Sequence, residues 1–121
     1  MMQYVLKDYH SADIASVWQW QPARPEDVYY NLQMEIGPTD QDGGTIFQVR
    51  VATPEALRAR AGCTGFLEGR CLLVVSPYSW PAVERRLHEI VRCCSGRDHA
   101  HVISMLCGFF LWEYEDHEFV E

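Results

Sequence analysis

Residues 28–36 alternate between apolar and polar side chains. The apolar set is Val28, Tyr30, Leu32, Met34 and Ile36, and the polar set is Tyr29, Asn31, Gln33 and Glu35. Because successive side chains of a strand point to opposite faces, this period of two predicts a strand with one buried face. Gly37-Pro38 ends the strand, and residues 40–44 predict a turn. A second strand over 45–52 would then complete an antiparallel hairpin.

Three further stretches predict helices. The first starts at Thr53-Pro54-Glu55 and ends near Ala61, and we expect the Thr53 hydroxyl to accept a hydrogen bond from a free N–H of the first turn. The second runs from Ser79 through Cys94, because its apolar residues recur at helical spacing. The third begins after Asp98, which can cap it.

The remaining segments complete the predicted sheet. Residues 2–8 predict a short strand, and the nearly continuous apolar run 70–75 predicts a central strand that is covered on both faces. Residues 109–117 predict a last strand with one buried and one charged face. Residues 11–27 form a long connection whose Trp side chains we expect to pack on the core. The sequence therefore predicts one α+β domain over residues 1–121, with a mostly antiparallel sheet of four to five strands and two to three helices packed on one face.

Acidic residues are concentrated in two parts of the chain. The net charge is -7, and five acids but no Lys or Arg fall in each of the ranges 26–42 and 113–121. Acidic surfaces repel phosphate backbones, so we expect no binding to nucleic acid. They also attract basic partners and accelerate their association. The charge pattern therefore favours a basic protein as the partner.

The cysteines and the N-terminus bear on the compartment. The five cysteines are odd in number, and their spacing matches no disulfide framework. The first ten residues lack the basic start and apolar stretch of a secretory signal. No apolar run reaches the roughly 18 residues of a membrane span. We therefore expect a cytoplasmic protein with reduced thiols that does not bind a membrane.

A few residues offer catalytic or metal-binding chemistry. Cys93-Cys94 with His99 and His101 supplies four possible zinc ligands, although their spacing fits no common zinc motif. A cysteine nucleophile with a histidine base is open on composition alone. Glu113 and Glu115, two residues apart, could serve acid–base catalysis or hold a cation. We interpret the thiols as core residues and the acids as a solvated face, and expect no catalytic residue, metal or other cofactor.

Several segments together resemble a known family. They are Glu35-Ile36-Gly37-Pro38, Phe47-Gln48-Val49-Arg50-Val51-Ala52-Thr53-Pro54, Gly69-Arg70-Cys71-Leu72-Leu73-Val74-Val75, Tyr78, and Phe110-Leu111-Trp112-Glu113-Tyr114-Glu115, with Trp18-Gln19-Trp20-Gln21-Pro22 before them. In this order they resemble the Immunity protein 8 family of bacterial polymorphic toxin systems. The resemblance implies a small cytosolic protein without catalytic residues that protects its cell by binding a cognate toxin domain.

The resemblance and the charge lead to one hypothesis about function. An acidic face with interspersed aromatic residues would cover a cognate toxin domain in a stoichiometric complex, and the charge suits a basic nuclease as that toxin. A thiol- or metal-dependent enzyme and a scaffold or assembly subunit remain as alternatives, and the oligomeric state stays open. The residues expected to bind the partner are Tyr29, Gln33, Glu35, Asp40, Asp42, Glu113, Glu115, Asp116 and Glu118.

Overall fold

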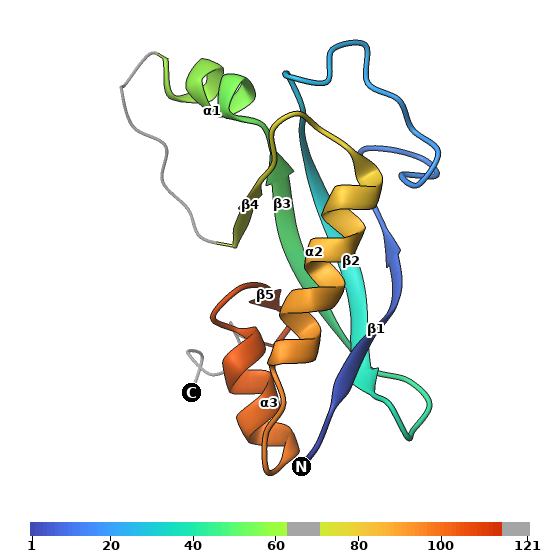
Figure 1. Ribbon diagram of the computed structural model, residues 1–121. Coiled ribbons are helices and arrows are strands. Elements are labelled where there is room, and N and C mark those ends of the chain that lie inside the picture. Colours follow the sequence, from blue (N-terminus) through green and yellow to red (C-terminus); the bar gives the residue numbers. More distant parts are fainter. Residues whose placement is uncertain (63–70, 115–121) are drawn as a thin grey trace.

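The computed structural model describes residues 1–62 and 71–114, which contain five strands and three helices (Figure 1). The strands are β1 (Tyr4–His10), β2 (Tyr29–Pro38), β3 (Thr45–Ala52), β4 (Leu72–Val74) and β5 (Leu111–Trp112). The helices are α1 (Pro54–Ala61), α2 (Trp80–Cys93) and α3 (His99–Leu106). The predicted α+β class with a mostly antiparallel sheet is confirmed.

The sheet is built around the hairpin of β2 and β3. Strand β1 pairs antiparallel with the outer edge of β2, with a bulge between Leu6 and Asp8. Two short strands share the other edge of β3: β4 pairs parallel with residues 50–52, and β5 pairs antiparallel with Phe47 and Gln48. Two segments from different parts of the chain therefore complete the backbone hydrogen bonding of one strand.

The alternating pattern of β2 and β3 places the core on one face of the sheet. Tyr30, Leu32, Met34 and Ile36 are at most 1% exposed, as the period of two predicts. Helix α2 runs across this face (Figure 1). It buries the apolar side of its surface against the sheet, with Val83, Leu87, Ile90 and Val91. Burying each such side chain contributes roughly 1.5–3 kcal/mol, so this layer contributes substantially to stability.

The connection between β2 and β3 needs glycine where its two backbone segments lie very close together. A Cβ atom on Gly37 would lie 2.2 Å from the carbonyl oxygen of Gly43, and one on Gly44 would lie 2.6 Å from that of Ile36. Gly43 itself has a φ of +82°, which favours glycine. The predicted hairpin with a loop longer than the tightest type is confirmed.

Two expectations about the strands were wrong or only partly tested. The apolar run at 70–75 is not a central strand: within it, β4 covers only Leu72–Val74 at the sheet edge, and Leu72 and Val74 are 40% and 49% exposed. Residue 70 itself lies outside the described residues. Strand β5 is likewise shorter than the strand predicted at 109–117, of which residues 115–117 lie outside the described part.

Thr53 begins helix α1, as expected, but its hydroxyl does not cap the helix. The side chain is fully buried, and its Oγ1 donates to the carbonyl oxygen of Glu26 at 2.6 Å and accepts from the N–H of Val28 at 3.0 Å. The hydroxyl therefore joins α1 to the entry of β2. Asp98 does cap its helix, because its carboxylate accepts from the N–H of His101.

The long connection between β1 and β2 packs on the core through only one of its two Trp residues. Trp20 contacts Tyr30 and Tyr78, with ring centroids 5.9 and 5.6 Å away, whereas Trp18 is 50% exposed. Farther along, Arg24 pairs with Glu26 and with Glu55 of α1. No helix among the described residues is long and apolar enough to cross a membrane.

Candidate functional site

The candidate site is the sheet face opposite α2, which we call the open face. Its side chains are largely polar and are exposed or half-buried. The residues of the open face are Asp8, His10, Tyr29, Asn31, Gln33, Glu35, Ile46, Gln48, Arg50, Leu72, Val74 and Leu111. These positions alternate with the buried set, so the same sequence period that builds the core also creates this face.

Three of the predicted binding residues lie on the open face, where β2 places them. Gln33 and Glu35 stand next to each other along the strand and are half-buried. Tyr29 lies at the far end of the strand, where the Arg60 guanidinium of α1 sits 3.5 Å from the centroid of its ring. Such stacking is favourable, and it places a positive charge at the end of the face that α1 borders.

The structure brings Glu113 to the start of the strand that leaves the acidic turn. Its carboxylate accepts hydrogen bonds from the backbone N–H of Ile46 and from the hydroxyl of Thr45, while its own N–H donates to the carbonyl oxygen of Ile46 at 3.0 Å. Glu35 is the pairing partner of Ile46 on the other side. The two acids therefore flank one residue of β3.

The other predicted acids divide between the turn and the undescribed part of the chain. Asp40 and Asp42 are exposed in the turn that directly precedes β3, so they lie at the same end of the sheet as Glu113. Their turn also binds a cation, since the Lys7 ammonium donates to the carbonyl oxygens of Gln41 and Gly43. Glu115, Asp116 and Glu118 lie outside the described residues.

Sequence reasoning missed Asp8 and His10. The strand over 2–8 was predicted, but its neighbour was not, and only pairing with β2 puts Asp8 opposite Glu35 and His10 opposite Gln33. The bulge before Asp8 also shifts the alternation of β1 by one residue. No periodicity in the sequence signals such a shift.

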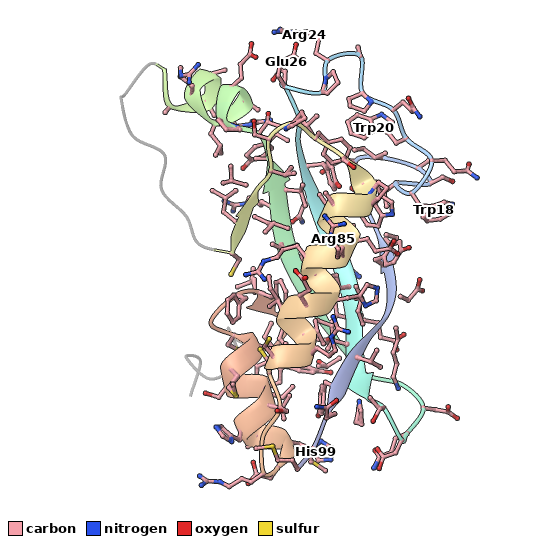
Figure 2. The ribbon with its side chains drawn as sticks, viewed as in Figure 1. Trp18, Trp20, Arg24, Glu26, Arg85 and His99 are labelled. Atoms are coloured by element: carbon pink, nitrogen blue, oxygen red, sulfur yellow. The ribbon has the colours of Figure 1, made fainter. Side chains whose placement is uncertain are left out.

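A hollow lies at the end of the molecule near the start of α2. It encloses about 400 Å³ and is lined by residues of the long connection and of the segment 78–81. Figure 2 shows Trp18 and Trp20 beside this end of α2. Prolines and aromatic side chains dominate the lining, with the amides of Gln19 and Gln21. Trp18 was expected in the core, but its side chain is 50% exposed beside this hollow.

The cysteine and histidine residues that suggested zinc are not gathered into a site. The Nδ1 atom of His99 forms a 2.6 Å hydrogen bond with the hydroxyl of Tyr4, and the thiol of Cys94 is 1% exposed in the core. Burial raises the pKa of Cys94, which makes it a poorer nucleophile. Across residues 1–62 and 71–114, no three His, Cys, Asp or Glu side chains are grouped so that they could hold a metal ion.

Comparison with known protein families shows to which family this chain belongs. The family model described as Immunity protein 8 matches residues 4–117, which is nearly the whole chain. The chain belongs to the Immunity protein 8 family. No curated protein and no solved structure matches it significantly.

Membership of the Immunity protein 8 family places this chain among the immunity proteins of toxin systems. The matched range includes all the described strands and helices of the sheet and its covering layer. It also includes every residue of the open face. The classification therefore applies to the folded domain as a whole.

Proposed function

We propose that this protein is a non-enzymatic immunity protein that binds a cognate toxin domain in a one-to-one complex and neutralises it by occlusion. The match to the Immunity protein 8 family over residues 4–117 is the observation that carries the proposal. It would act in the cytoplasm, where the toxin would otherwise reach its target. Its binding surface would be the open face and the adjoining turn.

The open face suits a protein partner for a physical reason. Polar and aromatic side chains on a rigid sheet need little ordering when a partner binds, so less of the interaction energy is lost as conformational entropy. Gln33 and Glu35 of β2 project from the most extensively paired part of the sheet. An inhibitor built on such a platform can cover an active site without chemistry of its own.

The acidic residues at one end of the open face favour a basic toxin surface. Glu35, Asp40, Asp42 and Glu113 gather there, and the only described cation among them is Lys7. Basic surfaces are typical of proteins that bind nucleic acid, so a nuclease is the class of toxin that this charge fits best. In that case the immunity protein would occupy the surface that the nucleic acid substrate needs.

Co-expression tests the proposal. The C-terminal domain of the protein encoded immediately upstream would be expressed with and without this chain. We expect cells to survive only when both are present, and we expect a one-to-one complex to co-purify. Survival without a complex would refute occlusion, and cell death in the presence of the folded protein would refute immunity towards that domain.

A further inference from the structure

The charges on the open face are separated by sign. Asp8 and Glu35 face each other on neighbouring strands near the turn between β2 and β3. Arg50 lies toward the other end, opposite Asn31 on β2, and Arg60 stacks over Tyr29 beyond it. Because Arg50 is four residues along β3 from Ile46, the partner of Glu35, the acidic and basic residues are separated by about 13 Å along the strand direction.

A hollow lies beside the two acidic residues Asp8 and Glu35. It measures about 250 Å³ and is lined by Asp8, His10, Gln33, Met34, Glu35 and Ile46. Like charges directly opposite each other destabilise a sheet, and a cation placed between Asp8 and Glu35 would offset this cost. Neither carboxylate forms an ion pair with any residue in 1–62 or 71–114.

The nearest described cation on β1 is already engaged elsewhere. The ammonium of Lys7 donates to the carbonyl oxygens of Gln41 and Gly43 in the turn, the second at 2.7 Å. Asp8 accepts one hydrogen bond, from the neighbouring N–H of Tyr9 at 2.8 Å. Its remaining acceptor capacity, and that of Glu35, is therefore available to donors from outside the described chain.

The basic position is similarly available. Arg50 is exposed and forms no ion pair within the part of the chain that the structure describes. Beside Arg50, the Asn31 amide donates to Gln48 at 3.1 Å, and the residues paired between the acidic and basic positions, Gln33 and Gln48, are uncharged. Leu72 lies opposite Arg50 and is 40% exposed, so apolar surface adjoins this guanidinium.

We infer that the open face docks the cognate toxin through a two-signed match. A Lys or Arg side chain of the toxin enters the hollow between Asp8 and Glu35, and an Asp or Glu of the toxin pairs with Arg50. The inference rests on the proposed function, and it adds Asp8 and Arg50 to the residues that bind the partner. Two charged contacts of opposite sign fix the register of docking, because a shifted or reversed partner would bring like charges together.

The test compares variants in a binding titration with the toxin domain that co-purifies with the wild-type protein. The acidic variant is Asp8→Asn with Glu35→Gln, the basic variant is Arg50→Gln, and the matched control is Glu84→Gln with Glu89→Gln on α2. We expect the dissociation constant to rise at least about tenfold for the acidic variant and by about tenfold for Arg50→Gln, whereas the control changes it less than about threefold. Circular dichroism and thermal melting would verify that each variant is folded.

Arg50→Gln separates the two-signed match from a uniformly acidic interface. If the toxin surface were only basic, removal of a positive charge from the face would leave binding unchanged or tighten it. That result, or an acidic variant that binds like the wild type, would overturn the inference while the proposed function stands. Absence of any complex with the wild-type protein would instead refute the proposed function.

Discussion

Glu113 forms hydrogen bonds with both backbone polar groups of Ile46, near the start of β3. Its carboxylate accepts from the Ile46 N–H, and its own N–H donates to the Ile46 carbonyl oxygen. Glu113, which the sequence predicts to be part of an interaction surface, therefore also has a structural role. The two roles can be separated, because glutamine keeps the hydrogen-bond acceptor and loses only the charge.

Glu113→Ala should lower the free energy of unfolding by about 1 kcal/mol, since it leaves the Ile46 N–H without its side-chain acceptor at an exposed edge. Glu113→Gln should retain most of that stability. Chemical denaturation of both variants measures the difference. Equal losses for the alanine and glutamine variants would contradict the structural role of the hydrogen bond.

The buried hydroxyl of Thr53 should matter more for stability. Thr53→Val keeps the shape of the side chain but leaves the Val28 N–H and the Glu26 carbonyl without their partner. The expected loss is about 1–3 kcal/mol, the cost of a buried polar group that is not hydrogen-bonded. Urea denaturation provides the measurement, and Thr53→Ser, which retains the hydroxyl, is the control. A valine variant as stable as the serine variant would show that the bond contributes nothing.

The close approach of the backbone at Gly37 to Gly43 and Gly44 predicts that adding a single methyl group at Gly37 lowers stability strongly. In Gly37→Ala the new Cβ atom would meet the Gly43 carbonyl oxygen at 2.2 Å and the Gly44 Cα at 2.7 Å, so the hairpin must shift. Overpacking of this kind typically costs about 1–3 kcal/mol. Gly43→Asn is the control, because nothing lies near its Cβ and asparagine tolerates positive φ. Thermal melting should show the larger decrease in melting temperature for Gly37→Ala. The reverse order would contradict the close backbone contact at Gly37.

Tyr9 predicts how stability depends on alkaline pH. Burial, together with the hydrogen bond that its hydroxyl donates to Glu84, raises the pKa of Tyr9 to about 12. The folded-state pKa of Tyr9 lies above the unfolded value of about 10. The contribution of Tyr9 to the free energy of unfolding is therefore fully present below pH 10 and is lost as the pH rises toward 12. Unfolding free energies measured across this range should fall less steeply in Tyr9→Phe than in the wild type. An identical slope would show that Tyr9 does not contribute.

The fold was predictable where the sequence pattern is local. The alternation at 28–36 identifies both the strand and its buried face, and the helical spacing of Val83, Leu87 and Ile90 identifies the buried side of α2. The run at 70–75 misled because a continuous apolar segment says nothing about how many neighbours a strand has. In the structure, β4 pairs with β3 at the sheet edge, and Leu72 and Val74 lie on the open face, 40% and 49% exposed.

The candidate site was only partly predictable, because it depends on pairing between distant segments. Gln33 and Glu35 followed from the strand period alone. Asp8 came to the open face through the bulge of β1 and its register with β2. Glu113 reached Ile46 through the pairing of β5 with β3, across 67 positions of sequence. Neither juxtaposition leaves a local signal in composition or spacing.

Titration of toxin activity with the purified protein tests the central claim most directly. Fixed amounts of the co-purifying toxin domain would be mixed with increasing amounts of this chain, and the remaining activity would be measured after short and long incubation. Stoichiometric occlusion predicts a linear fall that reaches zero at equimolar protein and does not change with time. Activity that persists in excess of the folded protein would contradict the account, and so would inactivation that proceeds with time at substoichiometric amounts.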